Sequence, residues 1–462
     1  MHHLTVRKFG PIENAELDVA RFLLFIGPQA SGKSTLAKLI YYFLHVRDEV
    51  VRFIRETASG PESDQMGPML KARLRRLFSE FFGSAPQPED MRIEYRYSDE
   101  FQLTVALDRS NGPYVDAQFS NEAEARIADL VREARALITS GPVTTPPPSE
   151  LAWLAVQEER SLLAKTYVVQ KCQKLFGCDK NLLFIPAGRS TLSILSEQFQ
   201  GIRQDLLDYP MRRFVRHAGF LRKVFGAGLD VPLCDPLADN NRDRPRAAIR
   251  KAREYVTGIL KGEYIHDDEG GKLLFAPGKF TKISYASSGQ QEALPLLLLL
   301  ARFLFLPHLP HLRGRTVYIE EPEAHLFPST QRLLVELMAR VFRARKSEMC
   351  LVITTHSPYI LTSINNLLQA GKTYAAASRA AQERLAQVVP PSSILKSDEV
   401  AFFTLENGGS KSILDPETGL IDGAAIDQVS DDIALQFDKL LYSFEKFEIG
   451  VKRVDGTVEK RV

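Results

Sequence analysis

Three short stretches of the sequence carry side chains that could act on a phosphate group. The first, GPQASGKS from Gly27 to Ser34, fits the pattern G-x-x-x-x-G-K-[S/T] without a mismatch. The second, TVYIEE, ends a β-prone run with Glu320 and Glu321, and the third, CLVITTH, ends an apolar run with His356. A glycine loop with a lysine, paired carboxylates and a histidine can bind a triphosphate and activate water against it.

The context of the glycine-rich stretch fits a phosphate-binding loop. The apolar run 22–26 predicts a buried strand before it, and the run from Thr35 onward predicts a helix after it. Its two glycines allow backbone angles at which successive N–H groups point at phosphate oxygens, beside the positive end of the helix dipole. Lys33 would neutralise the β- and γ-phosphates, and Ser34 would bind magnesium. The nucleotide ligands expected in this loop are Gly27, Pro28, Gln29, Ala30, Ser31, Gly32, Lys33, Ser34 and Thr35.

The two later stretches supply candidate acid–base groups. At the carboxyl end of a parallel strand, Glu320 and Glu321 would both face the ligand crevice. One carboxylate could hold magnesium, directly or through water, and the other could orient and deprotonate the attacking water. An ordinary acidic turn before a helix is the alternative. His356 is a candidate sensor of the γ-phosphate, although a lone histidine after a strand is more often structural.

A fourth segment points to a second subunit. Ser287, Ser288, Gly289 and Gln290 open a leucine-rich helix, and hydroxyl groups with a glycine at a helix start form an anion-binding end. One active site needs only one phosphate loop. We therefore expect this segment to serve a nucleotide that another subunit holds.

In their order and their motifs, these segments resemble the ATP-binding-cassette (ABC) ATPases. The phosphate loop comes first, followed by the segment Ser287–Gln290 at the place of the ABC signature, the paired carboxylates and, at the place of the switch histidine, His356. The phrases "IEEPEAHLFP", "ITTHSP" and "FIPAGRS" are similar to the SMC-like and overcoming-lysogenisation-defect-like AAA ATPases, which are found in DNA repair and in prokaryotic anti-phage defence. The resemblance implies that Glu321 is the general base, that His356 is the switch and that Lys33 and Ser34 bind phosphate and magnesium. Glu320 stands where the family often has an aspartate beside the metal.

The same resemblance implies a dimer around two nucleotides. Ser287 and Gly289 would reach the γ-phosphate held by the partner, and the segment Glu323–Leu326 would line the dimer seam. Ser288 and Gln290 depart from the glycine-rich signature of transporters, which favours the SMC-like group. The expected ligands are ATP and Mg²⁺, and the expected partners are a homodimer or higher homo-oligomer and a separate effector protein.

The expected fold follows from the resemblance and from the element pattern. It is an α/β P-loop NTPase of ABC type, with a mixed central sheet, an antiparallel β-subdomain and a large, mostly helical insertion. Four regions are expected. The N-terminal ATPase lobe with the phosphate loop spans 1–120, and the insertion spans 121–275. The signature, the paired carboxylates (Walker B) and the switch histidine lie in 276–395, and a C-terminal hairpin and helix follow in 396–462. Repeated prolines and the lack of sustained heptads argue against two long coiled-coil helices in the insertion.

Composition narrows the class of protein. With 44% hydrophobic and 25% charged residues, the chain reads as a soluble globular protein, and its net charge of +2 argues neither for nor against nucleic acid. The most apolar stretch, 294–306, is interrupted by Arg302 and is shorter than the roughly 20 residues of a membrane span. The four cysteines form no C-x-x-C pair, so reduced thiols in the cytoplasm are the simplest reading. Phe9 could stack on adenine or lie in the core.

The motifs favour an ATP-hydrolysing switch protein, and the family resemblance implies that it controls a nuclease or toxin in anti-phage defence. The resemblance to overcoming-lysogenisation-defect nucleases raises the question of a metal-binding Toprim domain after the ATPase segments. No D-x-D acidic cluster for such a domain is apparent there. A DNA-repair ATPase that binds DNA directly through Arg212, Arg213 and Arg216 is one alternative. An ABC transporter subunit is another, against which the large insertion argues. A nucleotide-dependent scaffold with negligible turnover is the third.

Overall fold

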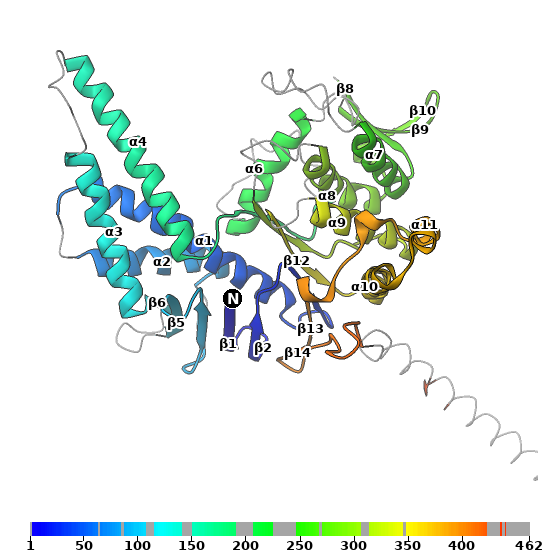
Figure 1. Ribbon diagram of the computed structural model, residues 1–462, viewed down its shortest axis with the longest axis horizontal. Helices are drawn as coiled ribbons and strands as arrows, with labels where there is room; N and C mark the ends of the chain where they lie inside the picture. Colours follow the sequence, from blue (N-terminus) through cyan, green and yellow to red (C-terminus); the bar gives the residue numbers. More distant parts are fainter. Residues whose placement is uncertain are drawn as a thin grey trace, which may run out of the picture.

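A computed structural model shows how these segments are arranged (Figure 1). It describes residues 2–62, 65–84, 87–107, 115–140, 150–190, 207–224, 246–267, 270–305, 314–344, 348–422, 435–436 and 439.

A mixed sheet runs through the described part of the chain, in the strand order β6-β5-β4-β1-β2-β14-β13-β3-β12-β11-β7. Its parallel half contains β13 (Val400–Glu406), β3 (Phe22–Ile26), β12 (Met349–Thr355), β11 (Arg315–Glu320) and β7 (Asn181–Ile185). Every side chain of β3 is buried, which explains its unbroken apolar sequence. The carboxyl ends of these strands share one edge of the sheet, where parallel α/β sheets bind ligands.

The other half of the sheet is mostly antiparallel. It contains β2 (Ile12–Asp18), β1 (His3–Phe9), β4 (Arg92–Arg96), β5 (Gln102–Leu107) and β6 (Val115–Phe119). The hairpin of β13 and β14 (Gly409–Ser412) joins the two halves, because β13 pairs with β3 while β14 meets β2. The predicted α/β fold with a mixed sheet and an antiparallel part is therefore confirmed.

Helices cover both faces of the sheet. One layer contains α1 (Lys33–Ser59), α2 (Met66–Phe82) and α3 (Asn121–Ser140), and the other contains α7 (Arg246–Leu260), α8 (Ser288–Phe305), α9 (Pro328–Ala344) and α10 (Pro358–Ala376). In β3, Phe22, Leu24 and Ile26 pack with the layer of α8, whereas Leu23 and Phe25 pack with the layer of α1. This alternation is the two-residue period of a strand.

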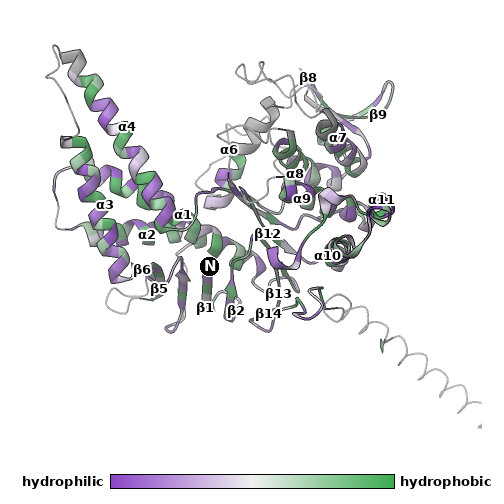
Figure 2. Cartoon of the chain, viewed as in Figure 1, coloured by the Kyte–Doolittle hydropathy of each residue, from purple (hydrophilic) through white to green (hydrophobic). Residues whose placement is uncertain are grey.

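Two helices leave the layers. The first half of α4 (Glu150–Leu175) extends beyond α3 and away from the sheet (Figure 1), and it mixes hydrophobic with hydrophilic residues (Figure 2). Its exposed large apolar side chains are Trp153, Leu154, Leu162 and Leu163. The second helix, α6 (Tyr209–Val224), begins beside α1, where Lys38 forms an ion pair with Asp208 at 2.7 Å. No helix in the described ranges is long and apolar enough to cross a membrane.

The remaining described elements lie next to the second helical layer. A small antiparallel sheet of β8 (Glu263–Asp267), β9 (Gly270–Ala276) and β10 (Lys279–Lys282) precedes α8, and α11 (Arg379–Val388) follows α10. The predicted C-terminal helix, 426–444, lies almost wholly outside the described residues.

The core decides between the two roles that the sequence left open for Phe9. Phe9 is only 4% exposed and packs against Phe78 and Phe82, with ring centroids 5.7 and 5.2 Å apart. A ring enclosed by α2 cannot stack on a nucleobase, so Phe9 belongs to the core. Phe9 lies on β1, which pairs with β2 on one side and with β4 on the other. Its ring therefore lies on a face of the sheet, and this is the face that α2 covers.

Candidate nucleotide site

The glycine loop follows β3 and runs directly into α1. Gly27, Ala30 and Gly32 have φ angles of 152°, 62° and 102°. A Cβ atom on Gly27 would lie 2.4 Å from the carbonyl oxygen of Leu405, and one on Gly32 would lie 2.8 Å from Cγ1 of Ile12. Only glycine fits at these two positions, because both the backbone angle and the space exclude a side chain.

Lys33 is the first residue of α1, and its ammonium group lies inside the loop. Nζ donates to the carbonyl oxygens of Gly27 at 2.9 Å and Pro28 at 2.6 Å. Burial lowers the pKa of Lys33 to about 8, and the nearby carboxylates of Glu321 and Glu323 act in the opposite direction. The loop thus surrounds a cation with acceptors that phosphate oxygens can replace.

The other predicted phosphate ligands lie on the same loop and on the first turn of α1. The exposed residues are Pro28, Gln29, Ala30 and Ser34, and the half-buried ones are Ser31 and Thr35. Their exposure leaves the tip of the loop accessible to a ligand from solvent. The helix N-terminus at Lys33 adds unpaired backbone N–H groups and a positive dipole end.

The paired carboxylates end β11 next to the loop. Glu320 is 6% exposed, and its Oε2 accepts a hydrogen bond from the backbone N–H of Ala187 at 3.3 Å. Its Oε1 is buried and has no hydrogen-bond partner. Glu321 has a φ of 43°, and its N–H donates to the carbonyl of Thr354 on β12 at 2.9 Å. The bond to β12 holds Glu321 in a left-handed conformation that a glutamate rarely adopts.

His356 brings the separate segments together. Its Nδ1 lies 3.1 Å from the carbonyl oxygen of Gly27, and its Nε2 lies 2.9 Å from Oε1 of Glu321. A carbonyl oxygen and an ionised carboxylate can only accept, so each of these contacts is a hydrogen bond when the ring nitrogen that faces it carries a hydrogen. One imidazole therefore bridges the phosphate loop and the second carboxylate, although more than three hundred residues separate Gly27 from His356 in the chain.

A third carboxylate anchors this histidine, which sequence reasoning did not predict. Oε1 of Glu323 accepts from the backbone N–H of His356 and from Oγ1 of Thr355, both at 2.7 Å. Burial raises the pKa of Glu323. The sequence signal for this residue was the third acidic residue of "EEPE". Its hydrogen-bond partners, however, become apparent only from the pairing of β11 with β12.

The signature segment is capped and packs on the turn after β11. Oε1 of Gln290 accepts from the N–H and the hydroxyl of Ser287, at 3.0 and 3.1 Å, in the manner of a capping box. Ser287 and Ser288 are exposed. A Cβ atom on Gly289 would lie 2.6 Å from the carbonyl oxygen of His325, so this glycine allows close contact between α8 and the turn.

The groups predicted to hold Mg²⁺ have suitable chemistry. Glu320 offers a buried carboxylate oxygen without a partner, and Ser34 offers an exposed hydroxyl at the start of α1. Mg²⁺ in phosphate sites usually takes one or two carboxylates together with phosphate oxygens and water. The two residues therefore fit a magnesium ion that a nucleotide brings with it.

Arg189 is a second residue that the sequence did not reveal. It lies in the phrase "FIPAGRS" after β7, and its guanidinium donates to the backbone carbonyls of Glu320 at 2.7 Å and Glu321 at 3.0 Å. The phrase itself was recognisable, but a role for the arginine needs the pairing of β7 with β11, which places the two segments side by side.

Two of the three basic residues proposed to bind DNA make internal contacts. Arg212 donates to Glu80 of α2 at 3.0 Å, and Arg213 is half-buried, with a ring nitrogen of His45 at 3.4 Å. Arg216 is exposed. Among the described side chains of α6, Arg212 and Arg213 are thus engaged with α2 and α1, which weakens the DNA-binding alternative for these two residues.

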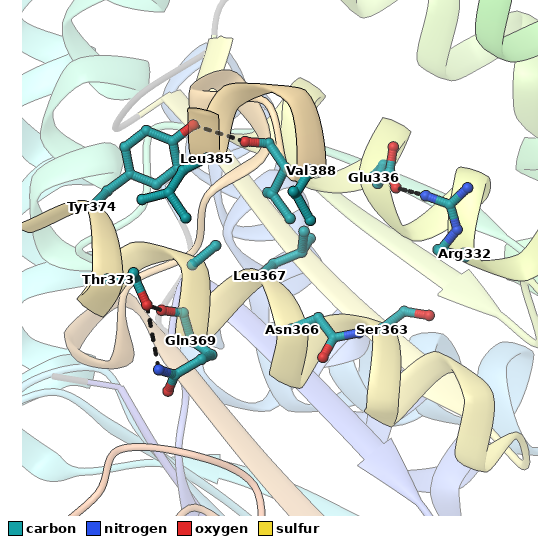
Figure 3. Close-up of a pocket in the computed structure, with 12 residues that line it drawn as sticks. Arg332, Glu336, Ser363, Asn366, Leu367, Gln369, Thr373, Tyr374, Leu385 and Val388 are labelled. Atoms are coloured by element: carbon teal, nitrogen blue, oxygen red, sulfur yellow. Dashed lines mark hydrogen bonds and ion pairs between the residues drawn. The ribbon is translucent and has the colours of Figure 1, made fainter. Parts of the chain in front are cut away.

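A cavity of about 380 Å³ lies apart from these residues, among α9, α10 and α11 (Figure 3). Leu367, Leu385 and Val388 line it, and the hydroxyl of Tyr374 donates to the carbonyl of Val389 at its border. No lysine and no glycine loop occurs among the described residues that line it. It is therefore not the nucleotide site.

Comparison with known proteins agrees with the chemistry of the site. Residues 241–361, which include Ser287, Glu320, Glu321 and His356, match the family model of an AAA ATPase domain. No curated protein matches the sequence.

Several solved structures are similar to this chain at low sequence identity. An SMC head bound to the C-winged helix domain of ScpA shares 12% identity, with 89% of this chain and 96% of that chain covered and a TM-score of 0.36. The SMC head domain from Thermotoga maritima shares 12%, with 89% and 97% covered and a TM-score of 0.33. An ATP-binding cassette of an ABC transporter in its ADP conformation shares 11%, with 89% and 90% covered and a TM-score of 0.26.

Proposed function

We propose that the protein binds and hydrolyses ATP and acts as a dimeric switch. The observation that carries the proposal is the bridge made by His356, which joins the carbonyl of Gly27 to the carboxylate of Glu321 at the ligand edge of the sheet. A water placed between that carboxylate and a γ-phosphate in the loop would have its base and its target together.

Each residue has a defined task in this mechanism. Lys33 exchanges its bonds to loop carbonyls for bonds to the β- and γ-phosphates, and its charge offsets the charge that develops on the transferred group. Glu321 orients the attacking water and takes its proton. His356 keeps the carboxylate aimed at the γ-phosphate position. Ser34 and Glu320 would hold Mg²⁺, which supplies further neutralisation of the phosphates when it is bound.

The signature end of α8 supports assembly into a dimer. Ser287 and Ser288 expose hydroxyl groups at a helix N-terminus, so this end can bind an anion supplied from outside the subunit. Tyr285 precedes Gly289 by four residues, Phe327 follows His325 by two, and the two rings are 82% and 74% exposed. Large exposed rings beside an anion-binding end suit an interface with a second copy of this chain.

The output of the switch is proposed from the family resemblance of the sequence. ATP binding closes the dimer, hydrolysis opens it, and the cycle controls a separate effector, a nuclease or toxin, in cytoplasmic anti-phage defence. The fold alone does not specify this output, since related ATPases serve several processes.

The test is the variant Glu321→Gln, which keeps the size of the side chain and removes the base. We expect wild-type protein to release phosphate from Mg-ATP, and the variant to bind ATP, to release at least ~100-fold less phosphate and to accumulate as a dimer in light scattering. Wild-type protein that binds no ATP, or that stays monomeric in both forms, would contradict the proposal. ATP binding without phosphate release by the wild type would instead support the scaffold alternative.

A further inference from the structure

A fully buried arginine holds the backbone on both sides of the proposed general base. None of the Arg189 side chain is exposed. One terminal nitrogen donates to the carbonyls of Pro186 at 3.1 Å and Glu320 at 2.7 Å, and the other donates to the carbonyl of Glu321 at 3.0 Å. A planar guanidinium with several fixed hydrogen bonds restrains its acceptors more tightly than a single donor would. The peptide that carries the Glu321 side chain therefore follows the position of Arg189.

The same arginine is tied to the signature helix. Glu292 lies on α8, and its carboxylate accepts from the backbone N–H groups of Arg189 at 2.9 Å and Ser190 at 2.7 Å. Nε of Arg189 donates to the carbonyl of Glu292 at 3.2 Å. Both side chains are at most 2% exposed, so water does not compete for these bonds. Burial lowers the pKa of Arg189, and the charge of Glu292 opposes that effect.

A second contact joins α8 to the same turn. A Cβ atom on Gly289 would lie 2.6 Å from the carbonyl oxygen of His325, so the helix start and the turn touch backbone to backbone. The turn contains two non-glycine residues at positive φ, Glu321 at 43° and His325 at 60°. Such conformations persist only where the surroundings fix them. A displacement of α8 would therefore act on this turn at two points: on Glu321 through Arg189, and on His325 through Gly289.

We propose that Arg189 is a positioning residue that couples the two pockets of the ATP-bound dimer. The inference rests on the proposed function. In that dimer, a nucleotide in the partner's loop contacts the Ser287–Gln290 segment of this chain, and Arg189 passes the resulting position of α8 to Glu321. Glu321 acts on the other nucleotide, which its own Lys33 holds. Each pocket thereby sets the general base of the other, and hydrolysis is cooperative in ATP.

The coupling is tested with two variants of the full chain and a matched control. Arg189→Lys keeps the charge but replaces the guanidinium with a single ammonium. Glu292→Gln keeps the shape but offers one acceptor where the backbone supplies two donors. The control, Glu336→Gln, removes a buried carboxylate of α9 that accepts from Tyr255 and from Arg332, and neither of these described partners belongs to the candidate site. Circular dichroism melts and titration with a fluorescent ATP analogue show whether each variant folds and binds nucleotide.

The readouts are phosphate release as a function of ATP concentration and ATP-dependent dimerisation. We expect wild type and Glu336→Gln to give Hill coefficients of about 1.5 or more, and both coupling variants to give about 1, with kcat at least ~10-fold lower and nucleotide affinity changed by less than ~3-fold. A merely structural role would lower kcat and leave the Hill coefficient of the wild type. If Arg189→Lys does not fold, Glu292→Gln decides alone.

The outcomes separate this inference from the function on which it rests. A wild-type protein that dimerises with ATP and releases phosphate with a Hill coefficient of 1 overturns the coupling and leaves the proposed function standing. Coupling variants that keep a Hill coefficient above 1 overturn it in the same way. A wild-type protein that neither dimerises nor releases phosphate overturns the proposed function itself, and the coupling with it.

Discussion

The contact between His356 and Glu321 makes a quantitative prediction for a double-mutant cycle. His356→Ala removes two hydrogen bonds: one to the carboxylate of Glu321 at 2.9 Å and one to the carbonyl of Gly27 at 3.1 Å. Glu321→Gln removes the charge from the first of these bonds. If the histidine works by aiming the carboxylate, the two changes remove one shared interaction and their effects are not additive.

The magnitude follows from the types of bond. A hydrogen bond to a charged group contributes about 1.5–3 kcal/mol and one between neutral groups about 0.5–1.5 kcal/mol. His356→Ala should therefore cost about 2–4.5 kcal/mol of transition-state stabilisation, or roughly 30- to 2,000-fold in kcat. In Glu321→Gln the amide oxygen can still accept, so the two changes share only the difference between a charged and a neutral bond, about 1–1.5 kcal/mol. The double variant should thus retain about 5- to 13-fold more activity than the product of the two single effects predicts.

The assay is single-turnover phosphate release at saturating Mg-ATP, with nucleotide binding measured separately. His266→Ala is the matched control, because His266 lies on β8 of the small sheet, outside the candidate site. It should release phosphate at the wild-type rate. Effects that multiply, with a coupling energy below about 0.5 kcal/mol, would refute the idea that His356 acts through Glu321.

Three further predictions follow from the site and its supports. Because the pKa of Lys33 is lowered to about 8, its ammonium is charged below that pH and lost above it. ATP affinity should weaken by up to about tenfold per pH unit above 8, while Lys33→Arg should give a flat profile in the same fluorescence titration; a flat wild-type profile would count against the role of this charge. Gly289→Ala should bind ATP normally and fail to form the ATP-dependent dimer in light scattering, because a Cβ atom would meet the carbonyl of His325 at 2.6 Å; a normal dimer would show that this contact is dispensable. Arg213→Ala should lower the free energy of unfolding by about 1–3 kcal/mol in urea titrations, since it removes a half-buried cation beside α1, while the exposed Arg216→Ala should change it by less than about 0.5 kcal/mol; equal effects would contradict this assignment.

The parts of the site that the sequence predicted are those in which local spacing determines the chemistry. The loop from Gly27 to Lys33 sets its own backbone angles, so its pattern predicts a structure without knowledge of the fold. Glu321 and His356 follow apolar runs that the sequence predicts as strands, and the carboxyl ends of parallel strands lie at one edge of a sheet. Their proximity was predictable for that reason.

The residues that the sequence did not predict depend on which strands become neighbours. Arg189 reaches Glu321 because β7 pairs with β11, and no local pattern around either residue indicates that pairing. Phe9 was ambiguous for the same reason: its ring is buried because α2 covers that face of the antiparallel strands. The sequence predicts no partner for the arginines of α6. In the structure, Arg212 donates to Glu80 of α2, a helix that lies far from α6 in the chain.

The position of β3 in the sheet has a consequence for biosynthesis. Its two neighbours, β12 and β13, are made long after it, and more than 370 residues of chain separate the end of β3 from the start of β13. At roughly 5–20 residues per second, a ribosome needs about 20–75 s to cover that distance. For most of this interval, until β12 is made, the glycine loop has neither flanking strand, and throughout it the carbonyl of Leu405 that closes against Gly27 does not yet exist. The nascent chain therefore cannot complete its nucleotide pocket until β13 has been made, and its exposed apolar strand needs shielding until then.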